Sequence, residues 1–396
     1  MLIEGAPIEV SRDDLAIGEP VPWRLFDREQ RLLLREGSTI ISERQISALL
    51  MRGAIRFETV EKKTRRIQKK KPAPLPEELK RRTNIPDALQ EYHHISERLM
   101  ECFYRLEDEQ SVPDLLTDID LLSQSLVSVI RQDPDKALVA LQLMNEYPYT
   151  VIHPIHVAIL MMIMEIHLKK GEEHQLSVVK ACLTQNIAMN SLQEELFTQV
   201  LPLDAEQKQA INQHPMMSAQ WLEDAGVTDQ LWLDMTRQHH EKDDGSGYPM
   251  KLKSDDICVE AKLLSLADRF SAMIYDRPFR GGMDCQEVMK TFIAEFQKEK
   301  RKLPLLMVQQ IGIYPPGSFV RLVNGETAFV VRRTGLSGKP VVASYISPNG
   351  VMFDPPRLRD TGASPHHVIK AICKVDPSNF DLDVVWQTLT SSRKPI

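Results

Sequence analysis

The residues best suited to chemistry gather in one short stretch that opens with two adjacent histidines. The stretch reads His239-His240-Glu241-Lys242-Asp243-Asp244-Gly245-Ser246-Gly247-Tyr248-Pro249. Imidazole is the commonest protein ligand for transition metals, and two neighbouring histidines at a helix end can reach one ion. The two glycines permit backbone conformations that a side chain would block, and Pro249 fixes the exit of the turn. The stretch therefore indicates a metal site, with an ordinary capped helix end as the alternative.

A second chemical feature is a carboxylate, Asp268, on an apolar helix face. Its neighbours one turn away are Leu264 and Ala272, and Ala261 lies a further turn back. A carboxylate in such surroundings costs several kcal/mol unless another group pairs with it. The ordinary partner is an arginine or a helix N-terminus, whereas the functional partner is a metal ion.

The full motif, HHExxDGxGYP, is the signature of the HD-GYP family, and the chain resembles that family over about residues 147–290. Two downstream segments, Leu266–Phe270 and Arg277–Arg280, resemble the family's Asp-bearing helix and its Arg-Pro-aromatic-basic segment. His153 and His214 stand where the family has metal-binding histidines. The resemblance predicts a mainly α-helical fold with an HD-superfamily core.

The resemblance also assigns roles to three groups of residues. The metal ligands would be His153, His214, His239, His240 and Asp268. The ligand's phosphates would contact Arg277 and Arg280, because guanidinium groups suit phosphate oxygens, although solvated surface arginines are the ordinary alternative. The partner-binding loop would consist of Asp244, Gly245, Gly247, Tyr248 and Pro249. An exposed aromatic on a rigid loop is a typical interface anchor, whereas packing of Tyr248 on the helical core is the structural alternative.

HD-GYP proteins are phosphodiesterases that hydrolyse cyclic di-GMP to linear pGpG or GMP with two or three metals, commonly iron or manganese. Two neighbouring metals generate hydroxide and hold the phosphate oxygens for in-line displacement. In that family the helix between His153 and His214 carries a His-Asp doublet, usually followed by Gly-Lys. The Asp of the doublet bridges the metals, and the lysine contacts phosphate.

The chain departs from the family at this doublet. Gln185 and Asn186 replace the His and Asp, and Ala188 and Met189 replace the Gly and Lys. Neutral amides are weak ligands for divalent transition metals and cannot replace a bridging carboxylate. Tyr149 also replaces the Glu that three-metal members use. We therefore expect no full dinuclear centre.

The surviving histidines His214, His239 and His240 could still hold one divalent transition metal, iron or manganese in the family, with an open position. The alternative is a hydrogen-bonded pocket that holds no metal.

Four segments of different composition must position these residues. Residues 1–60 form a small mixed α/β module, 61–86 a basic linker, 87–309 the helical HD-GYP domain, and 310–396 a β-rich module. The linker carries ten Lys or Arg and four Pro with almost nothing to bury, which favours a solvated spacer over an anionic-surface contact.

Local signals predict the elements inside these segments. Pro20–Phe26 and Arg31–Arg35 predict strands, and Ser42 begins a capping box for a helix. Asn324-Gly325 and Pro348-Asn349-Gly350 predict two hairpins in the last module. Breaks between helices are expected at Pro113, Pro134, Pro148 and Pro154.

Composition excludes some classes of protein. The 396 residues carry a net charge of -6, which argues against a general nucleic-acid binder, since that needs a basic face. The five cysteines have no metal or disulfide-framework spacing, so we expect reduced thiols and a cytoplasmic location. The N-terminus lacks the features of a signal peptide. The longest apolar run, Val157–Ile166, is too short to cross a bilayer, so no transmembrane segment is expected.

Three functions compete. The favoured one is a degenerate HD-GYP protein that senses cyclic di-GMP or engages a partner such as a GGDEF-domain cyclase through its loop, with weak or absent hydrolysis. The second is an active cyclic di-GMP phosphodiesterase with an altered metal site. The third is a purely structural adaptor. An intact loop motif beside a dismantled doublet favours the first.

Overall fold

The computed structural model describes most of the chain, with gaps that hold some of the predicted features. It describes residues 7–28, 32–34, 38–40, 43–57, 89–107, 112–144, 146–275, 281–299, 302–336, 338–373, 375 and 380–391. The cap residue Ser42, the basic linker 61–86 and the two predicted phosphate-binding residues, Arg277 and Arg280, lie outside the described residues.

The chain divides into two compact units. The first combines the described residues of Met1–Ile85 with Ser191–Gln207 and the described part of Asp276–Gly282. The second holds Pro86–Asn190, Lys208–Tyr275 and Met283–Ile396 where these are described.

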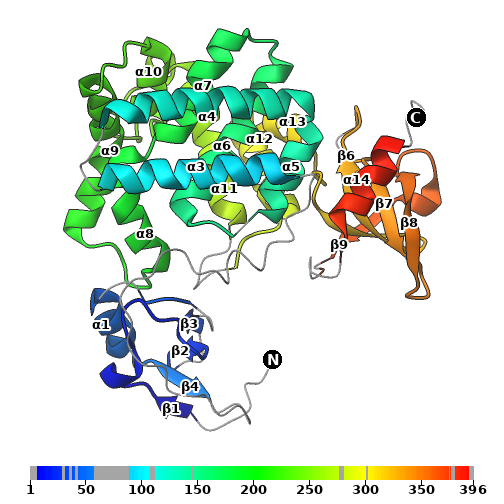
Figure 1. Cartoon of the computed structure of the whole chain (residues 1–396), viewed down its shortest axis with the longest axis horizontal. Coiled ribbons are helices and arrows are strands. Elements are labelled where there is room, and N and C mark those ends of the chain that lie inside the picture. The colour runs from blue at the N-terminus through cyan, green and yellow to red at the C-terminus, as the bar shows by residue number, and fades with distance from the viewer. Residues whose placement is uncertain are drawn as a thin grey trace. The chain divides into compact units, whose positions relative to one another are not determined.

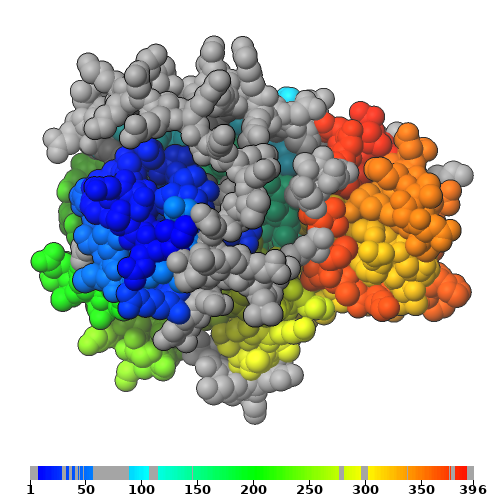
Figure 2. Space-filling model, turned by 90° about the horizontal axis from the view of Figure 1, so that it is seen from below, coloured from blue at the N-terminus to red at the C-terminus, as the bar shows by residue number. Residues whose placement is uncertain are grey.

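The first unit is built on a small antiparallel sheet, and its N-terminal residues form the blue body of Figure 2. Its elements are β1 (Pro7–Glu9), β2 (Leu25–Phe26), β3 (Leu32–Leu34), α1 (Glu43–Met51) and β4 (Ile55–Phe57). The strand order is β1-β4-β2-β3, and Leu25 lies opposite Leu34 in the predicted pairing of β2 with β3. The sequence did not predict β1 and β4, because three residues are too few to display an alternating pattern.

A segment from much later in the chain completes this unit. Helix α8 (Asn190–Thr198) is followed by Val200, which packs against the apolar core that the sheet and α1 enclose. Gln45, buried on α1, donates a hydrogen bond to the Thr198 carbonyl at 3.3 Å. The first unit therefore contains sequence from within the predicted HD-GYP domain.

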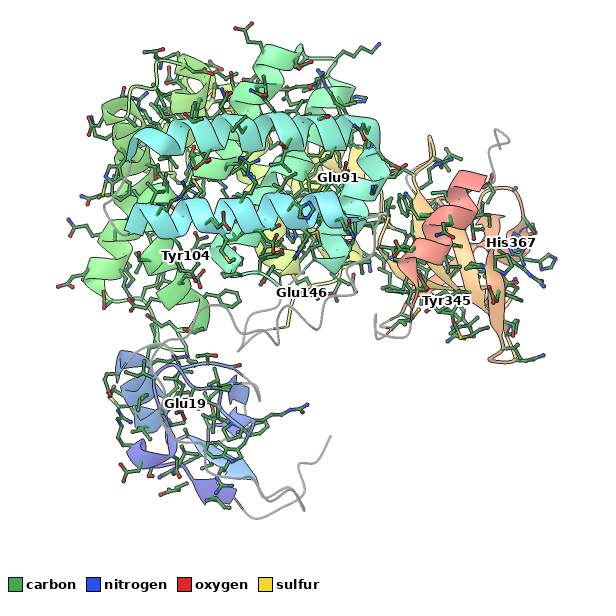
Figure 3. The ribbon with its side chains drawn as sticks, viewed as in Figure 1. Glu19, Glu91, Tyr104, Glu146, Tyr345 and His367 are labelled. Carbon is green, nitrogen blue, oxygen red and sulfur yellow. The ribbon has the colours of Figure 1, made fainter. Side chains whose placement is uncertain are left out.

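The second unit is a helical bundle around α6, which makes the fold mainly α-helical as predicted (Figure 1). Its helices are α3 (Gln90–Glu107), α4 (Val112–Gln132), α5 (Pro134–Leu143), α6 (Tyr149–His167), α7 (Glu172–Thr184), α9 (Ala205–Asp224), α10 (Gln230–Gln238), α11 (Val259–Ile274), α12 (Cys285–Glu299) and α13 (Lys302–Ile311). Helix α6 contacts α3, α4, α5, α7, α11 and α13. Figure 3 shows Glu91 and Tyr104 on α3, where Tyr104 is exposed.

Helix α6 corrects two expectations about its own sequence. Pro154 does not end a helix but lies inside α6, because burial of every residue from Tyr149 to Glu165 outweighs the backbone hydrogen bond that the proline removes. Pro134 and Pro148, in contrast, stand at helix starts as predicted. The apolar run Val157–Ile166 is short, but the helix that contains it has 19 residues and is long enough to span a membrane. Burial of 94% of its apolar window inside the fold is typical of a core helix.

The C-terminal part of the second unit confirms both predicted hairpins. Strands β5 (Phe319–Leu322), β6 (Thr327–Arg332), β7 (Val341–Ile346), β8 (Met352–Asp360) and β9 (Ile369–Ile372) form one antiparallel sheet in the order β8-β7-β6-β5-β9, and α14 (Leu382–Ser391) contacts β8. Tyr345, labelled in Figure 3, packs its ring 5.0 Å from Phe380. Arg333 joins this part to the helices through Asp135 at 2.5 Å and the Gln310 carbonyl. The sequence missed β9 and α14.

Candidate functional site

Three histidines from two helices meet in the second unit. His239 follows the last residue of α10 and His240 comes next, while His214 lies in the middle of α9. One ring nitrogen from each residue lies within 4.8 Å of the other two. His214 and His239 are buried and His240 is half-buried. The structure therefore brings together three of the five predicted metal ligands.

Backbone carbonyls fix how two of these rings present their nitrogens. His214 Nδ1 lies 2.7 Å from the Ile211 carbonyl oxygen, and His239 Nδ1 lies 2.8 Å from the Thr236 carbonyl oxygen. A carbonyl only accepts, so each Nδ1 must carry the proton and each Nε2 must present a lone pair. The two Nε2 atoms face each other at 3.2 Å. Two lone pairs at this distance repel each other unless a cation or a shared proton lies beside them.

A metal ion suits this arrangement better than a proton. Burial lowers the pKa of His214 to about 4 and that of His240 to about 3, and it lowers the pKa of His239 far below its usual range. The imidazoles are therefore neutral at physiological pH, which is the form that binds metals. Two nitrogens bound at about 2.1 Å to one ion are separated by about 3.0 Å in octahedral and about 3.4 Å in tetrahedral geometry. The observed 3.2 Å lies between these values, so His214 and His239 fit one divalent transition metal, and His240 offers a third nitrogen within 4.8 Å.

The other two predicted ligands pair with each other. His153 on α6 places Nε2 2.9 Å from Asp268 Oδ1 on α11, and its Nδ1 lies 3.0 Å from the Ser271 hydroxyl. The partner of Asp268 is thus an imidazole, and not the arginine, helix N-terminus or metal ion that the sequence led us to expect. Tyr149 stacks on the His153 ring at 4.8 Å. Both ring nitrogens of His153 are engaged, so this ring presents no free lone pair to a second metal.

The charge state of Asp268 follows from the same pairing. Burial alone would raise its pKa, but the hydrogen bond and the charge of His153 outweigh burial, so the pKa lies below its usual value. The ionised carboxylate is therefore held by its partner on α6.

Gln185 and Asn186, which we predicted to stand at the doublet positions, lie at the end of α7, between attachments to α9 and α10. The Trp232 indole of α10 donates to the Thr184 hydroxyl at 2.7 Å, and the Ala188 amide donates to the Ser218 hydroxyl of α9 at 3.2 Å. Gln185 is 1% exposed. Within the described residues, neither polar side-chain atom of Gln185 has a hydrogen-bond partner, nor does Asn186 Oδ1. Unsatisfied amides of this kind are costly in a buried site.

Two features of the glycine-containing loop hold its shape. The buried Glu241 carboxylate accepts hydrogen bonds from the amides of Met250, at 2.6 Å, and Leu252, at 3.0 Å. A side chain at Gly247 would bring its Cβ within 2.4 Å of the Lys242 nitrogen, so only glycine fits there. Glu241 is thus a structural clamp, which the sequence pattern did not reveal.

The aromatic of this loop covers the histidine cluster. Tyr248 is half-buried, and its ring lies 4.7 Å from that of His240 and 6.5 Å from that of His214. Exposed positions at the loop are instead Asp244, Ser246 and Met250. The packing of Tyr248 matches the structural alternative considered from the sequence, and the loop's role in partner binding stays a prediction.

Sequence reasoning missed two further polar residues of the pocket. Ser271, one turn beyond Asp268 on α11, is fully buried against His153. His156, one turn beyond His153 on α6, is 1% exposed, and burial lowers its pKa to about 3. Helical spacing from Asp268 and His153 was the signal that could have found both.

Comparisons with known proteins agree with the motif. The model of the HD domain family matches residues 136–300. The cyclic di-GMP phosphodiesterase PA4108 of Pseudomonas aeruginosa is 26% identical over 276 residues, which cover 69% of this chain and 66% of that protein. The cyclic di-GMP phosphodiesterase PdeB of Borreliella burgdorferi is 23% identical over 210 residues, which cover 52% of this chain and 54% of that protein.

A third relative is named for a different cyclic dinucleotide. The 3'3'-cGAMP-specific phosphodiesterase 3 of Vibrio cholerae is 26% identical over 142 residues, or 36% of this chain and 31% of that protein. The chain therefore spans less than two thirds of the length of each of these three relatives.

Proposed function

We propose that the chain, whose residues 136–300 match the HD domain family, is a degenerate member of the HD-GYP family that binds cyclic di-GMP without efficient hydrolysis. Binding of the ligand would change how the chain interacts with a signalling partner such as a GGDEF-domain cyclase. The names of two relatives support cyclic di-GMP as the ligand, and the name of the third makes 3'3'-cGAMP the competitor to test.

One observation carries the proposal. Gln185 and Asn186, which we align with the family's doublet from the sequence, are neutral amides, and Gln185 is buried with its polar side-chain atoms unpaired in the described structure. An amide can neither bridge two metals nor offset their charge as a carboxylate does. The chemistry of two-metal hydrolysis needs both ions at once.

A single metal would still have a use in ligand binding. His214, His239 and His240 would hold the ion, which supplies a positive charge for a phosphate oxygen. The half-buried Tyr248 ring beside His240 would limit access of water and shape the pocket wall. Asp268 would keep His153 in place and add no bridging ligand.

The second candidate, an active phosphodiesterase with a rearranged metal site, has one observation in its favour. His153 and Asp268 are both retained within the same pocket and need only separate from each other to become ligands. The hydrogen bond and the charge of His153 keep Asp268 ionised against the effect of burial, which opposes that step.

Calorimetric titration and a product assay on the manganese-loaded chain separate these candidates. We expect cyclic di-GMP to bind more tightly than 3'3'-cGAMP and to be recovered intact after incubation. The control is His239→Ala, which removes a metal ligand and should abolish the metal-dependent part of the binding. Repeated turnover to pGpG or GMP would establish the second candidate, and failure to bind either nucleotide would leave the purely structural adaptor.

A further inference from the structure

The N-terminal module, residues 7–57, has a physical route to the histidine cluster. We propose that this module is a regulatory input that controls the position of His214 through α8 and the start of α9. The inference deepens the proposed function, because it concerns regulation of the same pocket, and it rests on contacts inside the first unit and on the continuity of α9.

The first step of the route is the dependence of α8 on the module. Helix α8 has no fully buried residue of its own, and Leu192 to Val200 are all half-buried. A short helix of this kind gains its stability from tertiary contacts. The module supplies two of them, the apolar core that receives Val200 and the buried Gln45 that donates to the Thr198 carbonyl.

The second step is a hydrogen-bonded joint between α8 and α9. Gln207, in the first turn of α9, is 4% exposed. Its amide donates to Glu195 Oε1 at 2.9 Å and pairs with the Gln199 amide at 2.7 and 3.0 Å. Its backbone amide also donates to Asp204 at 2.8 Å, and the Asp204 amide donates back to the Gln207 side chain at 3.2 Å. Buried amide networks of this density lose several bonds together when one member moves.

The third step is the helix itself. His214 lies about two turns after Gln207, on the same face of α9, and both side chains are buried. Because an α-helix is stiff over two turns, a shift or loosening at Gln207 moves His214 relative to His239. The His214–His239 distance of 3.2 Å tolerates little movement if one ion is to contact both rings.

Amide hydrogen exchange on the full chain tests this route. Val200→Asp places a charge against the module's core and should accelerate exchange in α9 residues 206–214 at least tenfold. Leu203→Asp is the matched control, since Leu203 is an exposed apolar residue of the same segment, and it should leave α9 unchanged. Acceleration confined to the module and α8 in Val200→Asp would overturn the proposal.

A second variant guards against general unfolding of the module. Gln207→Leu removes the joint without touching the sheet, so exchange should rise in α9 and stay unchanged in β1 to β4. The zinc affinity of both Val200→Asp and Gln207→Leu should fall about tenfold. Substitutions of residues that orient metal ligands typically lower metal affinity by at least this factor. If the parent chain binds no zinc, the metal part of the proposed function fails, while the exchange result still decides whether the module and α9 are coupled.

Discussion

Two groups of side chains near the predicted metal site differ in how firmly hydrogen bonds hold them. On the α9–α10 side, three imidazoles converge and two of them are oriented by backbone carbonyls, with Glu241 fixing the loop above them. At the end of α7, Gln185 and Asn186 carry polar side-chain atoms without hydrogen-bond partners in the described structure, while Asp268 of α11 pairs with His153 of α6. His214 and His239 are therefore oriented by backbone carbonyls before any metal binds, whereas the Gln185 side chain has no hydrogen bond that holds it in the described structure.

The largest effect should come from removing one member of the converging side. His239→Ala deletes a metal ligand whose orientation is already fixed, so manganese or zinc affinity should fall at least about 100-fold. Asn186→Ala is the control on the opposite side and should change affinity little. Calorimetric titration of both variants measures their metal affinities. An equal loss of affinity in the two variants would show that both groups of side chains contribute alike to metal binding.

The next effect should come from changing the residues that we predict to stand at the doublet positions. Gln185→His with Asn186→Asp, together with Met189→Lys, returns the residue types that the family has at these positions, and it should raise the metal content by about one ion per chain. Hydrolysis need not return, because the groups around the ligands also determine activity. Elemental analysis of the folded triple variant gives the answer. An unchanged metal content would mean that these residues do not occupy the doublet positions.

An effect on stability, separate from metal binding, is expected from a buried carboxylate on α6. Glu165 on α6 is fully buried, and burial, followed by the charge of Glu260, raises its pKa to about 7 despite Lys170. The folded state then holds a proton that the unfolded state releases near pH 4.5. The contribution of Glu165 to stability therefore falls as pH rises from about 4.5 to 7, by roughly 3 kcal/mol.

Glu165→Gln should remove this slope, so the variant gains stability over the parent at pH 8 and not at pH 4.5. Burial also lowers the pKa of the neighbouring His174, 3.0 Å away, and a lowered histidine pKa gives a slope of the opposite sign, but this slope is common to the variant and the parent and cancels in their difference. Chemical denaturation at several pH values measures the slope, with exposed Glu173→Gln as the control. An identical slope in Glu165→Gln and the parent would show that the carboxylate is already ionised when folded.

The sequence predicted those parts of the molecule that depend on local pattern or on a motif. Asn324-Gly325 and Pro348-Asn349-Gly350 predicted both C-terminal hairpins, and the paired histidines predicted where ligands gather. Contacts between distant segments were not predictable. Ser271 meets His153 across 118 positions of sequence, and Gln45 meets Thr198 across 153. The burial of Tyr248 was likewise undecided, because one aromatic on a loop suits packing and partner binding equally well.

The central claim is that the pocket can hold one metal and not two, and metal counting tests it most directly. The full chain would be purified under reducing, anaerobic conditions with manganese and iron supplied, dialysed, and measured by elemental analysis alongside His239→Ala. The account predicts at most one tightly held ion per parent chain and none in the variant. Two tightly held ions per parent chain would contradict it, because Gln185 and Asn186 would then not have prevented a dinuclear centre.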